Sequence, residues 1–448
     1  MIKEENYKWE NWAGNHSCIA ANYFEPETAD QIADIIGYAV SNRLKVRVVG
    51  SGHSFTPLAL SNEVLVSLKH HGKLVSIENN FVTCQGGMLL HELYTILQEN
   101  KLSLANFGVI NKQTVAGAIA TGTHGSGLTH KSLSSLIHTM KIMTSSGSII
   151  EIDENTVIHT NNKEFNLLNA AAISLGLLGI VLEVTFKCEP LFFLQSEEHV
   201  ISFDEYLDSM DDDARRYEYF KAWWFPHTDK VYVYKTGRIA EGFGGRGKYE
   251  QYTAEQRSLD LEIDKVTAPM FIDSNDDATL IPEINRHCVE RFFTPRVRLG
   301  SSFEILVHDE TVPMIVSEYG LSMENDIHKK ALRAFRDTLE RSTIKAHFPV
   351  DLRYAGAERA WLSPSYNRDT FYIGMCVREY KKKEIPASMK LFFDVMRNYD
   401  ARLNWGKLSD STRGELKITY LMLDDFNGIR RFLDPHDIFQ NDYLKSIL

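Results

Sequence analysis

The first 190 residues combine short apolar strands with two helices. Apolar residues recur at helical spacing over 28–43 and again over 89–100, so both segments predict amphipathic helices. The expected strands are short and rich in β-branched residues, and they cover 46–49, 64–68, 74–78, 81–84, 140–144, 149–152 and 181–186. The turn Ser145-Ser146-Gly147 between two of them is typical of a hairpin. This mixture predicts an α+β domain made of two small lobes.

After Pro190 the pattern changes to longer strands in which apolar and polar residues alternate and aromatic residues are frequent. Helices are expected over 313–323 and 328–341. The strands expected in this part are 217–225, 230–235 and 371–377. Long alternating strands together with helices predict a second α+β domain built on an antiparallel sheet.

Two segments of the second part have unusual composition. The glycine-rich run 241–247 has no strand or helix pattern on either side, so we expect a mobile surface loop there. Residues 273–277 are similar to a calcium-binding loop, but Ala278 stands where that loop requires glycine, and no closing glutamate follows at the required spacing. The sequence therefore predicts no metal site.

Composition excludes several classes of function. The net charge of −11 argues against a nucleic-acid surface, which would be basic. The charged N-terminus lacks the apolar core of a signal peptide, and the longest apolar run, 170–182, is too short to span a membrane. Five scattered cysteines without close pairing indicate reduced thiols in a cytoplasmic protein rather than a zinc cluster.

The strand expected at 46–49 runs directly into Gly50-Ser51-Gly52-His53. Glycine has no Cβ, so a strand that ends in this way can bring backbone N–H groups against a phosphate. His53 would then project from the same turn toward the bound molecule. A dinucleotide fingerprint of the Rossmann type is excluded, because Phe55 stands at its third glycine and Pro57 interrupts the helix it requires. A purely structural turn remains the alternative explanation.

Two later segments share this richness in small residues. Residues 114–127 contain four glycines and three threonines, so the run can lie flat against a ligand and direct hydroxyl and N–H groups toward phosphate or ribose oxygens. Residues 174–181 form an apolar turn with Gly176 and Gly179 before a strand. Three such segments in one domain predict a nucleotide cofactor held by its pyrophosphate.

In these segments the sequence resembles the vanillyl-alcohol-oxidase family of FAD-linked (PCMH-type) flavoproteins, in its aldonolactone and alditol oxidase branch. Residues 11–15 and the Gly-Ser-Gly-His-Ser-Phe run are especially similar to alditol oxidases. The resemblance covers about 8–190 and 345–448, and it continues in motifs that follow the family's order: 347–353, 361–364, 404–407 and 433–441. It implies a PCMH-type FAD-binding domain over 8–190, a cap domain for the substrate over 191–415, and a C-terminal segment, 416–448, that packs back on the FAD domain.

The resemblance also implies residue roles around the flavin. His53 would bond covalently to the 8α-methyl group of FAD, although a histidine that only supports the turn is the simpler explanation. His124 would orient the second loop, and a structural role is equally open. The other residues expected to bind the cofactor are Val49, Gly50, Ser51, Gly52, Ser54, Phe55, Gly108, Val115, Gly117, Ala120, Thr121, Gly122, Thr123, Gly125, Ser126, Gly179, Ile180, Val181, Asn404 and Lys407.

Oxidation of a carbinol by a flavin requires cationic groups near the reacting atoms. Asp351 and Arg353 alternate on an expected strand, so both side chains point to one face and are similar to the family's Glu-x-Arg pair. Lys407 is similar to the lysine of the family's His-Trp-x-Lys motif, in which Asn404 here replaces the histidine. Without the resemblance, surface salt bridges would explain Arg353 and Lys407 equally well.

Three positions depart from the alditol oxidases, because Val109, Gly374 and Cys376 replace polar contacts to an open polyol. Loss of those contacts favours an aldono-1,4-lactone as the substrate. Gly108 leaves room for oxygen where a dehydrogenase of the family has alanine, so we expect an oxidase that releases H₂O₂. An alditol oxidase, a lactone dehydrogenase with another acceptor, a flavoprotein without turnover and a carbohydrate-binding module remain alternatives.

Overall fold

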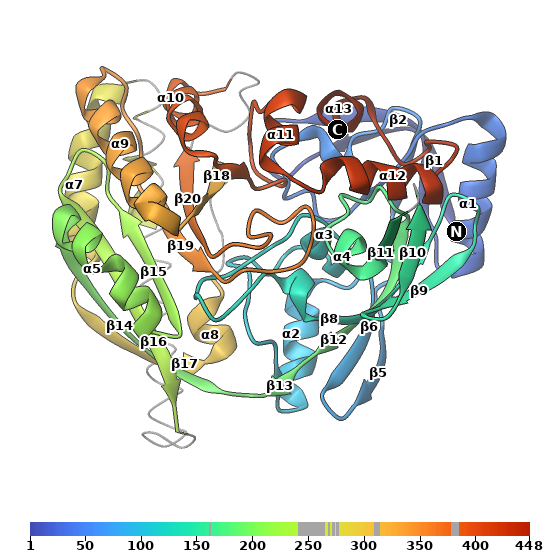
Figure 1. Cartoon of the computed structure of the whole chain (residues 1–448), viewed down its shortest axis with the longest axis horizontal. Helices are drawn as coiled ribbons and strands as arrows, with labels where there is room; N and C mark the ends of the chain where they lie inside the picture. The colour runs from blue at the N-terminus through green and yellow to red at the C-terminus, as the bar shows by residue number, and fades with distance from the viewer. Residues whose placement is uncertain are drawn as a thin grey trace.

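A computed structural model describes residues 1–160, 163–240, 265–267, 269–270, 274, 277–308, 314–377 and 385–448. The glycine-rich run 241–247 and most of the 273–277 segment lie outside these residues. The chain folds as an α+β protein, as the sequence predicted (Figure 1). Within the described residues, no helix is both long and apolar enough to cross a membrane, and no group of three or more potential metal ligands is found.

The first small sheet lies near the N-terminus and has the strand order β1-β2-β4-β3. β1 and β2 are antiparallel, whereas β4 pairs in parallel with both β2 and β3. Its strands are β1 (Ile2–Glu10), β2 (Ser17–Glu25), β3 (Val46–Val49) and β4 (Val64–Ser67). Helix α1 (Ala29–Asn42) packs its buried isoleucines against β3 and β4, which makes the core of this lobe.

The second lobe contains a five-stranded antiparallel sheet of order β5-β6-β12-β8-β9. Its strands are β5 (Leu74–Glu78), β6 (Phe81–Gln85), β8 (Ile137–Met143), β9 (Ile149–Asp153) and β12 (Ile180–Lys187). The hairpin predicted around Ser145-Ser146-Gly147 is confirmed, because β8 pairs with β9. The smaller elements are α2 (Leu90–Glu99), β7 (Leu102–Ser103), α3 (Val115–Ala120), β10 (Val157–Thr160), β11 (Lys163–Asn166), α4 (Leu167–Ala171) and β13 (Glu189–Pro190).

An eight-stranded antiparallel sheet dominates the second part, with the order β17-β14-β16-β15-β19-β20-β18-β21. Its strands are β14 (Phe193–Ser202), β15 (Tyr219–Trp224), β16 (Lys230–Ile239), β17 (Arg296–Ser301), β18 (Ile315–Ser322), β19 (Val350–Ala355), β20 (Thr370–Val377) and β21 (Arg402–Leu403). The helices of this part are α5 (Phe203–Arg216), α7 (Ile281–Phe292), α8 (Ser302–Leu306), α9 (Ile327–Arg341) and α10 (Ala387–Met396).

The two faces of this large sheet have different chemistry. Phe220 and Trp224 on β15 and Tyr354 on β19 belong to the apolar core that includes residues of α5 and α9. Because side chains alternate along a strand, Lys221 and Trp223 on β15 and Asp351 and Arg353 on β19 point to the opposite face. That opposite face carries charged groups into the cavity described below.

The helix predicted over 313–323 is wrong, because its described residues form β18. The strand pairs with β20 on one side and β21 on the other, and nearly all its residues are buried. A short apolar segment buried on both faces has no clear period, so spacing alone cannot distinguish a strand from a helix. The helix predicted over 328–341 is confirmed by α9.

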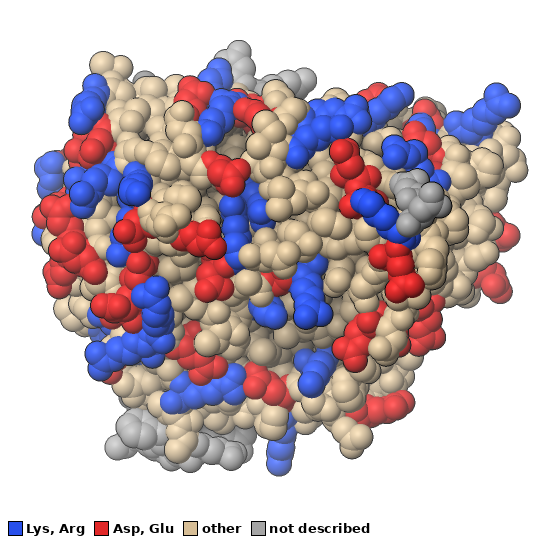
Figure 2. All heavy atoms as spheres, in the orientation of Figure 1, with Lys and Arg blue, Asp and Glu red and all other residues tan. Residues whose placement is uncertain are grey.

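The C-terminal helices α11 (Arg413–Thr419), α12 (Leu423–Leu433) and α13 (Asp442–Ile447) lie on the same side of the molecule as the N-terminal strands (Figure 1). The Val46 N–H donates to the Ile438 carbonyl at 2.7 Å, and the Asn441 side chain donates to the Pro57 carbonyl at 2.8 Å. The end of the chain is therefore hydrogen-bonded to the segment around the Gly50–His53 turn. On the face shown in Figure 2, acidic and basic side chains are interspersed.

Candidate active site

Two neighbouring cavities share residues of the first part: the main cavity lies where its loops meet the charged face of the large sheet, and the second lies within the first part itself. The main cavity has a volume of about 280 Å³, and the second has about 130 Å³. His53, Ser54, Gln113 and Thr121 line both, so the cavities form two parts of one elongated site. Such a shape suits a long ligand with chemically different ends.

The second cavity is built from the three small-residue segments that the sequence singled out. A Cβ on Gly50 would collide with the Thr114 hydroxyl, so only glycine fits where these two segments meet. Gly52 has a φ of +74°, which side chains other than glycine rarely adopt. The predicted cofactor residues that line this cavity are Val49, Gly50, Ser51, Gly52, His53, Ser54, Gly117, Ala120, Thr121, Gly179, Ile180 and Val181.

Other predicted cofactor residues lie elsewhere. Phe55, Thr123, His124, Asn404 and Lys407 line the main cavity. Gly125 and Ser126 line a third cavity of about 30 Å³ beside it. Three predicted cofactor residues line none of these cavities: Val115, Gly108 and Gly122. Val115 is fully buried in the core. A Cβ on Gly108 would meet Thr123, and one on Gly122 would meet Ile173. These three residues support the loops rather than forming the cavity walls.

His53 lies at the junction of the two cavities. Its Nδ1 atom is buried and has no hydrogen-bond partner among the described residues, and its ring centroid is 5.1 Å from that of Trp12. Burial, assisted by the charges of Lys407 and Lys112, lowers the pKa of His53 to about 4. The imidazole is therefore neutral at pH 7, and no group in the described part of the chain bonds to its Nδ1. A nucleotide in the second cavity with its reactive end in the main cavity would pass this nitrogen.

Asp351 and Arg353 form an ion pair on β19, and both line the main cavity. Asp351 lies opposite Gly374 on β20, so the small residue leaves space beside the carboxylate. Asp351 Oδ1 and Arg353 Nε are buried and have no hydrogen-bond partner within the described ranges of the chain. Because one acceptor atom and one donor atom of this pair remain available for hydrogen bonds, the pair can bind a polar ligand in the cavity. A surface salt bridge, by contrast, would be exposed to solvent.

Glu318 on β18 is a charged residue that the sequence did not reveal. Its carboxylate accepts a hydrogen bond from Asn404 Nδ2 at 2.7 Å and lies 3.2 Å from His124 Nε2. Burial opposes its charge, but His124 and then the charges of Arg353 and Lys407 hold the pKa of Glu318 well below its usual range. Glu318 thereby ties the second glycine-rich loop to the 404–407 segment.

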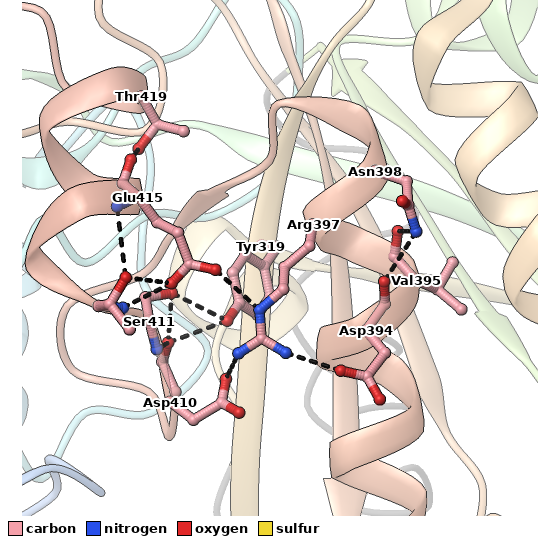
Figure 3. A network of polar contacts seen from close by, with 11 residues as sticks. Tyr319, Asp394, Val395, Arg397, Asn398, Asp410, Ser411, Glu415 and Thr419 are labelled. Atoms are coloured by element: carbon pink, nitrogen blue, oxygen red, sulfur yellow. Dashed lines mark hydrogen bonds and ion pairs between the residues drawn. The ribbon is translucent and has the colours of Figure 1, made fainter.

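The segment that carries Lys407 is held from both sides. Phe55 N–H donates to the Gly406 carbonyl at 2.8 Å, and Leu408 N–H donates to the Val316 carbonyl of β18 at 2.8 Å. Beyond Lys407, Arg397 donates to Asp394, Asp410 and Glu415, and the Tyr319 hydroxyl lies beside Ser411 (Figure 3). These contacts fix the direction in which Lys407 enters the cavity, where its Nζ lies 5.2 Å from the Phe55 ring centroid.

Arg47 is a second buried charged residue that the sequence did not reveal. Its guanidinium donates to the carbonyls of Leu58, Leu175 and Phe439, which belong to three separate parts of the chain. No sequence signal distinguishes such an arginine, because its carbonyl partners can come from any residue type. Arg47 lines the second cavity and holds its walls together.

Comparisons with known proteins agree with this geometry. A family model described as "FAD binding domain" matches residues 20–153, and one described as "D-arabinono-1,4-lactone oxidase" matches residues 184–447. L-gulonolactone oxidase of Scyliorhinus torazame is 30% identical over 447 residues, with 98% of each chain covered. L-gulono-1,4-lactone dehydrogenase of Mycobacterium tuberculosis is 28% identical over 443 residues, covering 98% of this chain and 99% of that protein.

Among solved structures, cholesterol oxidase from B. sterolicum superposes with a TM-score of 0.77 at 15% identity, covering 100% of this chain and 97% of that one. This likeness concerns the fold alone. A FAD-binding part joined to a cap with an antiparallel sheet defines the protein as an FAD-linked oxidoreductase. The chain belongs to the D-arabinono-1,4-lactone oxidase family. The family resemblance predicted from the motifs is thereby confirmed.

Proposed function

We propose that the protein oxidises an aldono-1,4-lactone, with FAD as hydride acceptor and O₂ as the final acceptor, and releases H₂O₂. The observation that carries this proposal is the convergence of Arg353, Asp351 and Lys407 on one cavity that also contains His53. Both the relatives and the family model bear names of enzymes acting on such lactones.

We divide the chain into an FAD-binding domain over 8–190, a cap domain over 191–415 and a C-terminal segment over 416–448. The last strand of the first two sheets, β12, ends at Lys187, and the first strand of the large sheet, β14, begins at Phe193. Hydrogen bonds from Val46 and Asn441 across to the opposite end of the chain support a C-terminal segment that returns to the first domain.

The residues present fit FAD, and each has a distinct task. The glycine-rich turns of the second cavity would hold the pyrophosphate with backbone N–H groups, and His53 Nδ1 would bond to the cofactor. When bound, the flavin supplies the hydride-accepting centre. Lys407 would contact the reacting hydroxyl, and Arg353, oriented by Asp351, would stabilise negative charge that develops in the cavity.

The cavity wall favours a lactone over an open alditol. Val109, Gly374 and Cys376, which the sequence proposes as substrate contacts, line the main cavity. Valine and glycine offer no polar side-chain atom to a chain of hydroxyl groups, so a polyol would give up hydrogen bonds to water without replacement. A cyclic lactone has fewer hydroxyl groups and loses less.

The test is peroxide release by the yellow protein in air, with a panel of aldono-1,4-lactones beside xylitol and sorbitol. Turnover of a lactone with poor alditol activity supports the proposal. Preference for an alditol would show that Val109, Gly374 and Cys376 do not discriminate. Anaerobic flavin reduction by a lactone without peroxide release in air would identify a dehydrogenase, as in the mycobacterial relative's name.

Gly108 allows a direct test of the oxygen reaction. We expect Gly108→Ala to slow reoxidation of the reduced flavin by O₂ at least about tenfold, because the added methyl group would press on Thr123, whose side chain lines the main cavity. The variant is compared with Gly108→Ala/Thr123→Ser, which removes the collision with Thr123 Cγ2 and should restore most of the rate. Stopped-flow reoxidation is measured in both and in Thr123→Ser alone. Equal rates in all four proteins, wild type included, would contradict this role.

A further inference from the structure

Lys221 and His308 form a polar pair on the cap side of the main cavity that the proposed chemistry leaves without a task. His308 lines the main cavity, and Lys221 lies on the face of β15 that carries Trp223. Lys221 Nζ is 3.0 Å from His308 Nε2. No sequence motif predicts this pair, since the two residues are far apart in the chain.

The surroundings of Lys221 make it a donor with no carboxylate partner among the described residues. Its ammonium lies 4.4 Å from the Tyr234 ring centroid and 5.4 Å from that of Trp223. Burial lowers the pKa of Lys221 to about 8, so the ammonium is still charged at pH 7. The other charged groups facing the pair are Asp351 and Arg353 on β19, Glu198 on β14, and Arg296 and Arg298 on β17.

The charge of Lys221 determines the proton position on His308. Burial, followed by the nearby ammonium, lowers the pKa of His308 well below its usual value, so the ring is neutral at pH 7. An ammonium can only donate, so Nε2 must accept and the single ring proton must be on Nδ1. Among the described residues no group bonds to Nδ1, and it is not sealed in the interior. It therefore presents one N–H donor to the cavity.

The backbone places this donor next to a predicted substrate contact. The His308 N–H donates to the Val109 carbonyl at 2.8 Å, which fixes the cap residue against the loop of the FAD-binding part. Asp351, Arg353 and Lys407 line the same cavity. A ligand bound between Lys407 and Val109 would meet His308 on its cap side.

We propose that His308, held in one tautomer by Lys221, donates its Nδ1–H to the lactone carbonyl oxygen and so selects lactones over sugar derivatives without a carbonyl. This inference rests on the proposed function and deepens it. A carbonyl oxygen can only accept, which matches a ring nitrogen, Nδ1–H, that can only donate. A ligand whose ring has a methylene group in place of the carbonyl would cover the His308 Nδ1–H without offering it an acceptor. The loss of this hydrogen bond creates the selectivity.

The kinetic test compares an aldono-1,4-lactone with the 1,4-anhydroalditol of the same configuration, whose ring lacks only the carbonyl. In His308→Phe we expect kcat/KM for the lactone to fall about tenfold to thirtyfold, with less than about a twofold change for the anhydroalditol. His308→Asn, which keeps a donor, should recover part of the loss. His287→Phe on α7 is the matched control. Equal losses on both substrates, or no loss, would overturn the inference.

A second measurement determines the tautomer of His308 without requiring enzyme turnover. In the holoenzyme labelled with ¹⁵N in its histidine rings, the His308 resonance, assigned with His308→Asn, should report the Nδ1–H tautomer. Lys221→Met should shift it toward Nε2–H, while Lys221→Arg should preserve it. An Nε2–H ring in the wild type, or no change in Lys221→Met, would overturn the inference.

The kinetic test distinguishes failure of the proposed function from failure of the role assigned to His308. If the wild-type protein oxidises no lactone, both proposals are overturned. If it oxidises lactones but His308→Phe keeps the same selectivity, only the role of His308 is overturned.

Discussion

Replacement of Arg353 by methionine should lower the rate of flavin reduction by the lactone about a thousandfold. Methionine fills similar space but removes the cation, and Arg353 Nε is a buried donor that bonds to none of the residues the structure describes. The nearby Lys221 would retain its charge but cannot supply a planar group with several donors. For this reason Arg353→Lys should also lose about a hundredfold. Anaerobic stopped-flow reduction measures both variants.

The pairing with Asp351 calls for two controls. Arg353→Met leaves a buried carboxylate without its partner, which typically destabilises a protein by about 3–5 kcal/mol. Asp351→Asn/Arg353→Met removes that charge, and it should recover thermal stability but not rate. Arg298→Met changes another buried arginine of the large sheet, one that does not line the main cavity, and should retain the rate. A normal reduction rate in Arg353→Met would remove this arginine from the proposed chemistry.

The local elements of the fold could be predicted because their signals are local. Helix α1 shows its apolar spacing, and the β8–β9 hairpin shows its turn residues. Strand β18 could not be predicted, because its conformation depends on pairing with β20 and β21. Those partners lie about fifty and eighty residues further along the chain, beyond any spacing rule.

The candidate site divides in the same way. His53, Arg353 and Lys407 could be identified from sequence because short motifs surround them. Glu318 and the Lys221–His308 pair could not, because strand register in the large sheet brings Glu318 and Lys221 to their positions and a backbone hydrogen bond to Val109 holds His308. Glu318 lies opposite Gly374 on β20, which in turn lies opposite Asp351 on β19. One row across three strands therefore places two carboxylates on the cavity wall, and no single segment of sequence contains that row.

Covalent attachment of the flavin should depend entirely on His53. We expect the flavin of the wild-type protein to stay with the polypeptide after acid precipitation, and that of His53→Asn to be released completely. The neutral imidazole has an unoccupied Nδ1 at the junction of the two cavities, and no other histidine lines both. Asparagine keeps a polar side chain of similar reach but cannot form the bond. Flavin absorbance in the pellet and supernatant measures the outcome.

The same variant should separate attachment from binding. Since the glycine-rich turns remain, His53→Asn should still bind added FAD, and loss of the bond should lower both the flavin potential and the reduction rate, the latter roughly tenfold. His16→Asn, which changes another histidine hydrogen-bonded to the same loop at Phe55, should keep its flavin attached. Because the pKa of His53 is about 4, its ring is already unprotonated at neutral pH. Attachment to the apoprotein should therefore proceed at one rate from pH 6 to 9, and a rate that rises steadily with pH over this range would contradict a neutral His53 as the attachment site.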